Sequence, residues 1–328
     1  DYGNRLNLTF DEMDRLVSQA KDLGTHLFML TGGEPLVRKG DVLKLAEKHH
    51  DCLFNIFTNA SLVDDVFCRD VQRLGNIVSL ESYEPSVNDG RRGDGSFEEV
   101  MNAFDLMHKY GLLYGTSTAY TRDNTERVSS DEFFDLIISK GCRFAWYFHY
   151  MPVGEGANAD LMPTVEQREY MFRRIREIRG IEGGKPIFAM DFQNDGEFVG
   201  GCIAGGRVYC HVNARGDVEP CVFIHYSNVN IKTADSWLDC LRQPLFQAYR
   251  AHYPWNKNML QPCPMLENPA ILPRLVNESG ATTSEYVAPE SAEDLCGRTS
   301  PYARKWAPKA KELWNEMYPT GEKVYADE

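Results

Sequence analysis

The sequence predicts an α/β protein in which a parallel sheet with helices outside it is followed by a cysteine-rich C-terminal extension. Over the first two-thirds of the chain, short apolar runs alternate with amphipathic segments, and the connections between them are short. From about residue 200, glycine, proline and cysteine become frequent, and six of the nine cysteines lie beyond that point. We therefore expect one domain over residues 1–199 and a second region over residues 200–328.

Six strands are expected, because six apolar runs are too short for helices and end at polar or glycine residues. They cover residues 26–31, 52–58, 76–81, 112–121, 143–151 and 186–192. Helical periodicity covers residues 9–24, 42–50, 62–75, 96–111, 129–141 and 164–180. Thr9 with Glu12, and Ser96 with Glu99, have the spacing of a helix-capping box.

The order of these segments favours a partial barrel over an open, doubly wound sheet. The chain opens inside a helix, so we expect that a first strand and the loop after it precede Asp1.

The C-terminal region has a different character. Residues 208–221 predict a hairpin that turns at Arg215 and Gly216. Residues 236–252 predict a helix interrupted by Pro244, and residues 301–318 predict a terminal helix. The stretch between these helices has no clear periodicity, so bound metal is one candidate source of its order.

Composition excludes some classes of function. The net charge of −13 argues against a duplex nucleic-acid binder, because such proteins need clustered Lys and Arg. No apolar run reaches the roughly 18 residues that a membrane span requires. The odd number of cysteines favours a reducing compartment, and we expect a cytoplasmic protein.

The motif with the clearest chemistry is Thr31-Gly32-Gly33-Glu34-Pro35, directly after the first expected strand. Active sites in parallel sheets lie beyond the carboxyl ends of the strands. Glycines let the backbone approach a ligand, and a glutamate can accept a proton from a ligand ammonium group. The alternative is a simple strand-to-helix turn in which Glu34 caps the helix.

This motif resembles the GGEP turn of the radical S-adenosylmethionine (SAM) enzymes, which binds the amino group of SAM. The resemblance implies that Gly32, Gly33, Glu34 and Pro35 contact SAM. The segment Phe57-Thr58-Asn59-Ala60-Ser61 resembles the family's TNG, so Thr58 and Asn59 are expected beside the cofactor.

Further positions are implied by the same resemblance. Ser79 and Glu81 match polar residues that face the ribose, and Arg92 matches the partner of the SAM carboxylate. Ser117 is expected at the end of the next strand, in contact with SAM. Val153 and Gly154 are expected beside the adenine. Ser79, Ser117 and Val153 are equally compatible with ordinary strand ends.

The family binds its catalytic [4Fe–4S] cluster through C-x3-C-x2-C upstream of the GGEP turn, and no cysteine precedes Gly32 here. The residues from Asp1 onward resemble the family's segment directly after the last of those cysteines. We therefore expect a truncated chain that cannot cleave SAM by itself, from a parent protein that is an enzyme.

The cysteines of the second region form another pattern. Cys202, Gly216 and Cys221 make C-x13-G-x4-C, which resembles the SPASM and twitch extensions that hold auxiliary iron–sulfur clusters. Cys263 and Cys296 are expected to complete four thiolates for one auxiliary [4Fe–4S] cluster. A structural zinc ion is the alternative, and Cys210 is a weaker alternative ligand.

The sequence supports two hypotheses about function. The first is an enzyme that uses a 5'-deoxyadenosyl radical on an unknown substrate, a peptide or a small molecule, with a flavodoxin or ferredoxin as electron donor. The second is a catalytically inactive relative that acts as a binding module with a structural metal site.

Two polar groups near strand ends have open roles. His149 is expected to contact substrate if its strand face points inward, or else to belong to a packed aromatic strand. Gln193, Asn194 and Asp195 are expected either to bind substrate or to form a turn.

Overall fold

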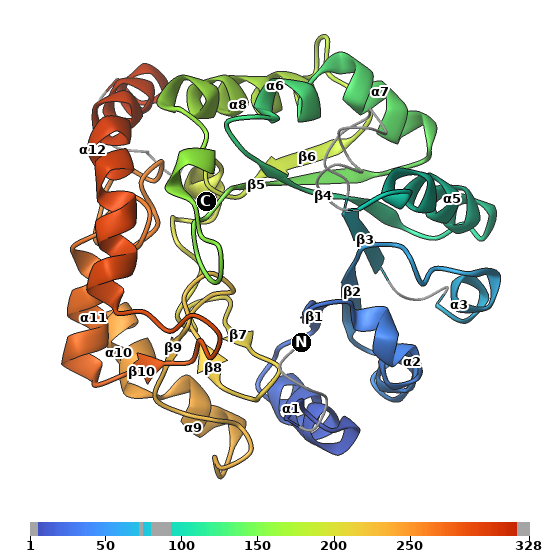
Figure 1. Cartoon of the computed structure of the whole chain (residues 1–328), viewed down its shortest axis with the longest axis horizontal. Coiled ribbons are helices and arrows are strands. Elements are labelled where there is room, and N and C mark those ends of the chain that lie inside the picture. The colour runs from blue at the N-terminus through green and yellow to red at the C-terminus, as the bar shows by residue number, and fades with distance from the viewer. Residues whose placement is uncertain (1–5, 72–74, 80–92, 320–328) are drawn as a thin grey trace, which may run out of the picture.

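A curved, all-parallel sheet is the main feature of the computed structural model, which describes residues 6–71, 75–79 and 93–319. The six strands pair in the order of the sequence. They are β1 (Leu27–Leu30), β2 (Leu53–Thr58), β3 (Gly75–Ser79), β4 (Tyr114–Tyr120), β5 (Phe144–His149) and β6 (Phe188–Asp191). This order has no reversal, so the sheet is built like a barrel wall and not like a doubly wound sheet (Figure 1).

Helices cover the convex side of the sheet, as Figure 1 shows. They are α1 (Phe10–Asp22), α2 (Lys39–Lys48), α3 (Asp65–Asp70), α5 (Ser96–Lys109), α6 (Thr125–Val128), α7 (Asp131–Ser139) and α8 (Val165–Ile178). Three short 3-10 turns are η1 (Pro35–Arg38), η2 (Ala159–Leu161) and η3 (Gly196–Phe198).

The strands have two unlike faces because successive side chains point to opposite sides of a sheet. One face packs against the helices in a core that contains Phe54, Ile56, Tyr147 and Ala189. The opposite face, which we call the concave face, points toward the centre of the molecule (Figure 1).

One predicted capping box is confirmed and the other is wrong. The Thr9 hydroxyl accepts from the Glu12 backbone N–H, and the Glu12 carboxylate accepts from the Thr9 backbone N–H. Helix α5 instead has Gly95 at its N-cap, with a left-handed φ of 83° and no capping side chain. Ser96 is the first residue of that helix, so its hydroxyl is one position too late to cap it.

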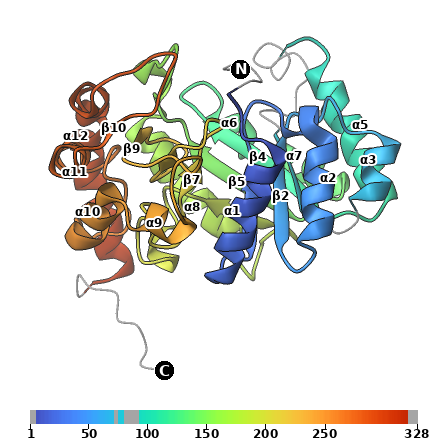
Figure 2. The same cartoon turned by 90° about the horizontal axis from the view of Figure 1, so that it is seen from below.

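The C-terminal region continues from β6 and lies along one side of the molecule (Figures 1 and 2). Its strands are β7 (His211–Val212), β8 (Val218–Glu219), β9 (Tyr226–Ser227) and β10 (Thr282–Thr283). Its helices are α9 (Trp237–Leu241), α10 (Pro244–His252), α11 (Ile271–Ser279) and α12 (Ala292–Met317).

Two predictions about this region are confirmed and one is wrong. β7 and β8 form the predicted antiparallel hairpin, and Pro244 ends one helical segment by starting the next. The stretch before residue 301 is not without helix, because it contains α11 and the first turns of α12. Helix α12 begins at Ala292, before the predicted start at residue 301. Pro301 lies inside the helix, and a proline is usually interpreted as a helix start.

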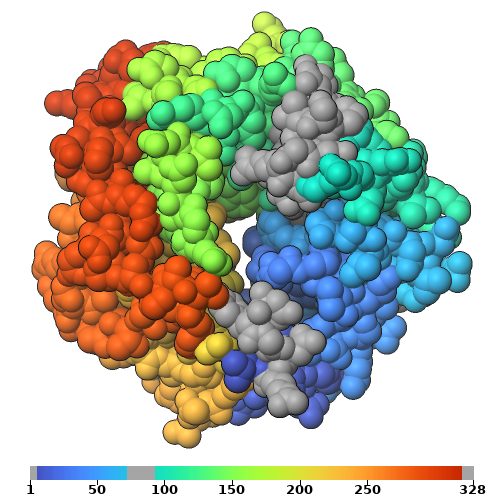
Figure 3. Space-filling model, viewed as in Figure 1, coloured from blue at the N-terminus to red at the C-terminus, as the bar shows by residue number. Residues whose placement is uncertain are grey.

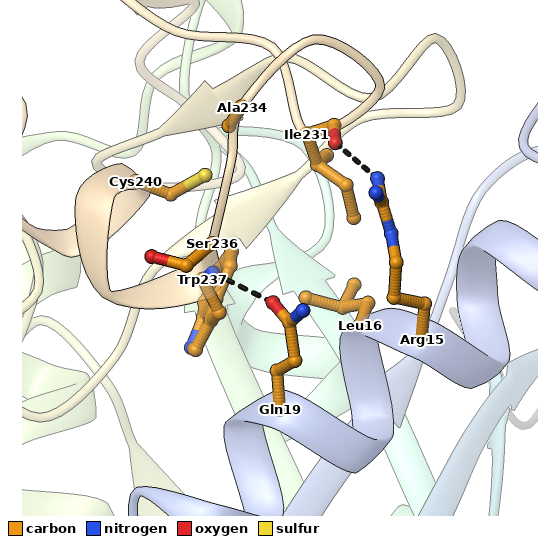
Figure 4. Close-up of a pocket in the computed structure, with 8 residues that line it drawn as sticks. All are labelled: Arg15, Leu16, Gln19, Ile231, Ala234, Ser236, Trp237 and Cys240. Atoms are coloured by element: carbon orange, nitrogen blue, oxygen red, sulfur yellow. Dashed lines mark hydrogen bonds between the residues drawn. The ribbon is translucent and has the colours of Figure 1, made fainter.

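The C-terminal region also contacts the first helix. The Arg15 guanidinium donates to the Ile231 carbonyl at 2.5 Å, and the Trp237 backbone N–H donates to the Gln19 side-chain oxygen at 2.7 Å. Figure 4 shows these two bonds on either side of a small pocket that Cys240 also lines. In the part of the chain that the structure describes, no helix is long and apolar enough to cross a membrane.

Candidate SAM and metal sites

The Glu34 carboxylate lies where the carboxyl ends of β1 and β2 meet. It accepts hydrogen bonds from the Thr58 hydroxyl, the Asn59 backbone N–H and the Leu36 backbone N–H, each at 2.8 Å. Glu34 is also the N-cap of η1, and Pro35 occupies the first position of that turn. The expected capping role is therefore confirmed, and it fixes the carboxylate in place.

This geometry leaves room for a ligand. Three donors do not exhaust the roughly four lone-pair sites of a carboxylate, and Glu34 is partly exposed. Gly32 and Gly33 are exposed, with no atom within 4 Å of where a Cβ would stand, and Gly32 has a φ of 126° that favours glycine. An ammonium donor could reach the remaining lone pair of Glu34 across these glycines.

The predicted neighbours Thr58 and Asn59 differ in what they offer. Thr58 is buried and its hydroxyl is already directed at Glu34. The Asn59 side chain accepts from the backbone N–H and hydroxyl of Ser61, so it shapes the turn, while its backbone N–H supports Glu34. Both residues position the glutamate.

Ser117 does not end its strand, which corrects the prediction for this residue. β4 runs on to Tyr120, and Ser117 pairs in the middle of the strand with Ser79 of β3 and Trp146 of β5. Alternation puts Ser117 on the concave face.

Several expected SAM contacts cannot be placed. Ser79 is the last residue of β3, but only its backbone is described. Glu81 and Arg92 lie outside the described residues. Val153 and Gly154 follow β5 in a turn where Gly154 has a φ of 76°, and Val153 packs against an apolar cluster of the C-terminal region.

The four predicted metal ligands, Cys202, Cys221, Cys263 and Cys296, lie in one apolar cluster although they are far apart in sequence. Burial raises the pKa of Tyr249 well above its usual range, and each of the four cysteines raises it further. Cys210 belongs to a different cluster, next to Cys240, so the structure does not bring this alternative ligand to the four.

One of these sulfurs accepts a backbone hydrogen bond, because the Leu266 N–H donates to Cys263 Sγ at 3.4 Å. The backbone N–H groups of Ala204 and Phe223 act to lower the pKa of Cys202 and Cys221, although burial outweighs them. Backbone N–H groups directed at a sulfur stabilise a thiolate, the form that binds metal.

The Tyr249 hydroxyl is buried and has no hydrogen-bond partner. A buried hydroxyl without a partner costs free energy, and all four thiols act on the pKa of this one. A cluster with acceptor sulfurs would supply the missing partner, so the residues fit an iron–sulfur group.

As free thiols these cysteines would be protonated at neutral pH. Burial raises the pKa of Cys202 to about 11 and those of Cys221 and Cys296 to about 12, and it raises that of Cys263 well above its usual range. Metal binding must therefore displace protons.

Within the described residues, no three His, Cys, Asp or Glu side chains converge as a single-ion site. The zinc alternative thus has no preformed geometry there. A four-iron cube also needs its cysteine sulfurs around one place, but at larger separations than a single ion does.

Sequence reasoning missed a buried ion pair beside Cys263. Arg168 of α8 and Glu267 are fully buried, with Nη1 and Oε1 2.8 Å apart in the orientation of an ion pair and not of a directed hydrogen bond. The second Glu267 oxygen accepts from the Cys263 backbone N–H at 2.7 Å. A separation of 99 residues gives the sequence no signal for this pair.

The structure gives His149 and residues 193–195 structural roles. His149 points to the helix side, buried, with Nδ1 on the Tyr150 carbonyl, and burial keeps its pKa well below the usual value. Asn194 contacts Arg168 and Asp191, and Asp195 pairs with Arg179. A substrate contact by His149 is therefore wrong, and residues 193–195 form a structural turn.

Comparison with known proteins identifies this architecture. Residues 1–128 match the model of the radical SAM superfamily. The AdoMet-dependent heme synthase of Nitratidesulfovibrio vulgaris is 26% identical over 254 residues, covering 68% of this chain and 67% of the relative. The mycofactocin maturase MftC of Mycolicibacterium smegmatis is 28% identical over 233 residues, covering 65% of this chain and 54% of the relative.

Solved structures agree at the level of the fold. Streptococcus suis SuiB has a TM-score of 0.58 at 18% identity, covering 74% of this chain and 62% of that chain. The enzyme anSMEcpe with bound AdoMet and Cp18Cys peptide has a TM-score of 0.57 at 14% identity, covering 94% of this chain and 90% of that chain. The chain therefore spans less than two-thirds of both SuiB and MftC.

Proposed function

Residues 1–128 belong to the radical SAM superfamily, and from this premise we propose that the chain binds SAM at Glu34 and belongs to a peptide-modifying enzyme with an auxiliary [4Fe–4S] cluster. In this superfamily SAM supplies a 5'-deoxyadenosyl radical that abstracts hydrogen from the substrate. The protein contributes binding, orientation and an environment for that chemistry.

The observation that carries the proposal is the Glu34 carboxylate. Bonds from Leu36, Thr58 and Asn59 hold it at the strand ends with one side open, above two exposed glycines. A fixed carboxylate beside a glycine turn suits the ammonium group of an amino-acid ligand such as SAM. Arg92 is proposed as the partner of the SAM carboxylate, on the resemblance alone.

The residues present do not fit the catalytic cluster, because no cysteine precedes Gly32 in the sequence. No step through that cluster is therefore assigned to this chain. The enzymatic activity is proposed for the whole protein, and this chain by itself is expected to bind SAM without cleaving it.

The residues do fit an auxiliary cluster. Cys202, Cys221, Cys263 and Cys296 would hold it, because they share one apolar cluster with the unpartnered Tyr249 and all four act on the pKa of its hydroxyl. Such a cluster transfers electrons or anchors a substrate. A flavodoxin or ferredoxin as reductant, and a cytoplasmic location, complete the proposal.

A peptide substrate is supported by the relatives. SuiB has been solved bound to precursor peptide SuiA, and anSMEcpe has been solved bound to the Cp18Cys peptide. Both resemble this chain only in fold, so the peptide remains a proposal here.

The inactive binding module, with a structural metal site, stays as a second candidate. Both candidates predict that this chain by itself does not cleave SAM, and one assay tests that expectation. After anaerobic treatment with iron, sulfide and a reductant, we expect SAM binding but no 5'-deoxyadenosine by chromatography. Formation of 5'-deoxyadenosine would contradict the absence of a catalytic cluster site.

Equilibrium binding of SAM tests the site itself. Glu34→Gln keeps the size and an acceptor oxygen but removes the charge, so SAM affinity should fall by roughly 1–3 kcal/mol, the cost of losing a charged partner. Glu47→Gln makes the same change on the exposed side of α2 and should leave the affinity unchanged. Equal affinity in wild type and Glu34→Gln would reject the assignment.

A further inference from the structure

The concave face of the sheet carries no charged side chain among the residues that the structure describes. Strand register brings together the residues of this face, which alternate with the core residues. Its members are Leu27, Met29, Leu53, Asn55, Phe57, Gly115, Ser117, Ala119, Phe144, Trp146, Phe148, Phe188 and Met190.

Aromatic rings dominate this face. Phe57 of β2 and Trp146 of β5 meet with ring centroids 5.8 Å apart, although β3 and β4 separate their strands. Contact across two intervening strands requires the sheet to curve, so these two rings bridge the concave face and form a floor.

A second group of rings stands beside this floor, toward the carboxyl ends of the strands. Phe148 and Phe192 are stacked at 4.4 Å with an interplanar angle of 17°, and Trp146 touches Phe192 at 5.7 Å. Phe223, from the C-terminal region, reaches Phe148 at 6.4 Å. The barrel and the extension thus share one aromatic wall.

These rings are not a closed core. Phe57, Trp146, Phe148, Phe192 and Phe223 are all partly exposed, whereas the rings on the helix side, such as Phe54 and Tyr147, are fully buried. Figure 3 shows an opening at the centre of the molecule, between the N-terminal part and the segment after β5. The concave face, which carries Phe57, Trp146 and Phe148, points toward the same centre (Figure 1).

The aromatic wall is continuous with the Glu34 site. Phe57 precedes Thr58, whose hydroxyl is bonded to Glu34, and Phe148 is one residue from the end of β5. A molecule resting on the floor would therefore lie below the strand ends, next to a cofactor bound there.

The chemistry of the wall selects what can rest on it. A phosphate or carboxylate placed against these rings would lose its hydration with no opposite charge to replace it. An ammonium would gain only the modest attraction of a ring face, about 0.5–2 kcal/mol. A flat, uncharged ring gains both buried apolar area and favourable ring packing. Ser117 and Ala119, in register with Trp146 and Phe148, are small residues beside the rings, whereas the Phe144 ring itself packs over Gly115.

We infer that the substrate presents a flat, uncharged aromatic group to this wall. This inference rests on the proposed function, because it concerns the substrate of the same site. The group belongs to an aromatic side chain of a peptide, in line with the proposed function. A free macrocyclic ring shares the chemistry that the wall recognises, and the test separates this other source from the peptide.

Fluorescence anisotropy with labelled peptides of one length tests the inference on the full chain. The peptides differ at one central residue, which is Trp, Tyr, Ser, Asp or Lys, and a neutral porphyrin serves as the free ring. We expect the Trp and Tyr peptides, or the porphyrin, to bind roughly tenfold or more tightly than the Ser, Asp and Lys peptides. Preference for the peptides or the porphyrin identifies the source of the ring.

Two substitutions make the test specific to the wall. Trp146→Ala should remove most of the preference, whereas Trp146→Phe should keep it, and thermal melting of both checks that they fold. Should Trp146→Ala fail to fold, Phe148→Ala against Phe148→Tyr replaces it. Equal binding of all probes, no binding of any, or a preference that survives removal of the ring would overturn the inference.

Binding of SAM, measured separately, keeps this inference distinct from the proposed function. Loss of SAM binding in Glu34→Gln with the aromatic preference intact is expected if both are right. Absence of SAM binding in the wild type, with aromatic probes bound, would reject only the proposed function. If Trp146→Ala weakens SAM and not the probes, the wall belongs to the cofactor site and the inference is wrong.

Discussion

Ala60 is the only residue other than glycine, among those the structure describes, with a left-handed backbone, at a φ of 73°. It follows Asn59 directly, at the position where the resembling TNG motif has glycine, and it is buried. A Cβ in this conformation costs about 1–2 kcal/mol. The turn that supports Glu34 is thus held in place against local strain.

Replacing Ala60 by glycine should relieve that strain. We expect Ala60→Gly to raise the free energy of unfolding by about 0.5–1 kcal/mol, since relief of the Cβ clash is partly offset by the larger unfolded-state entropy of glycine. Ala46→Gly, inside helix α2, should lower it by about 1 kcal/mol. Urea unfolding measures both, and a loss of stability in Ala60→Gly would contradict this interpretation of the turn.

Tyr249 allows a prediction with two readouts. Without metal its hydroxyl is buried and unpartnered, so Tyr249→Phe should stabilise the protein by about 1 kcal/mol. With a cluster bound, the Tyr249 hydroxyl would donate to it and stabilise its reduced state, which carries the more negative charge. Tyr249→Phe removes this donor and therefore makes reduction less favourable. The reduction potential should then fall by roughly 40 mV, the equivalent of about 1 kcal/mol for one electron.

The control for Tyr249 is its neighbour Tyr253. The Tyr253 hydroxyl donates to the Gly200 carbonyl, so Tyr253→Phe should destabilise the metal-free protein and leave the potential nearly unchanged. Unfolding titrations and potentiometry followed by electron paramagnetic resonance supply the measurements. A potential that moves equally in both variants would rule out a direct bond from Tyr249.

At the scale of single residues, sequence motifs predict contacts that the chain makes over short distances or at neighbouring strand ends. Glu34 and Thr58 are expected together and are bonded. The strand-end position of Ser117 comes from the family resemblance and is wrong, whereas the predicted strand over residues 112–121 agrees with β4 in extending beyond Ser117. The partners of Arg168 come from four separate segments, which no local pattern could indicate.

At the scale of elements, the strands of the C-terminal region are too short to be stable alone, with two residues each. Glu219 of β8 joins them. Its fully buried carboxylate accepts from His211 at 2.6 Å, His225 at 3.2 Å and Ser284 at 2.5 Å. One carboxylate therefore links β7 and β8 to the segments beside β9 and β10.

This link should make stability depend on pH. Burial acts to raise the pKa of Glu219, but the bonds from His211 and His225 outweigh it and lower the pKa to about 2. The stabilisation is thus present above the unfolded value of 4.5 and is lost as the pH falls toward 2. Burial lowers the pKa of His225, but Glu219 outweighs it, so the net pKa is raised above 6.5. The stabilisation that comes from protonated His225 is lost as the pH rises past its raised pKa.

The variant Glu219→Gln tests this window. We expect it to be less stable than wild type by on the order of 2 kcal/mol between about pH 4.5 and 6.5, with a smaller difference on either side. Unfolding free energies measured from pH 3 to pH 9 give the profile. A difference that is constant with pH would show that Glu219 acts through packing and not through charge.

The elements themselves are largely predictable in the sheet and less so in the extension. In the sheet, strands and helices alternate with polar and glycine boundaries, so each of the six strands lies at its predicted place. Helix α6 escapes prediction because four residues carry no period. Helices α11 and α12 contain prolines and are held by packing against α10 and each other, which the sequence pattern does not show.

At the scale of the molecule, one buried arginine joins the sheet domain to the extension. Arg168 of α8 donates to Asn194 and to the carbonyls of Gln193 and Leu260, and its guanidinium lies 4.1 Å from the centre of the Trp306 ring of α12. Its ion partner is Glu267, next to Cys263. The predicted division near residue 200 is therefore crossed by a fully buried polar network.

A buried ion pair of this kind costs desolvation, so its two halves should not behave independently. Arg168→Met leaves the Glu267 carboxylate buried without a cation and should lower the free energy of unfolding by about 3–5 kcal/mol. Arg168→Met combined with Glu267→Leu removes both charges and should recover much of that loss. The two single effects and the double effect are compared in one double-mutant cycle by urea unfolding.

The pH dependence of Arg168→Met separates charge from packing. Burial raises the pKa of Glu267, and Arg168 is the group that opposes this. Without Arg168 the carboxyl should take up a proton in the folded state at a higher pH than in the unfolded state. The folded variant then binds more protons, so its stability should fall as the pH rises from about 5 to 8, and its deficit relative to wild type should be largest at the upper end. The double variant has no such carboxyl and should show no added slope.

Two outcomes would contradict a role for the charge. The single variant could lose the same stability at every pH, or the double variant could be as unstable as the sum of the singles. In either case Arg168 joins the two regions by packing on Trp306 and not through its charge.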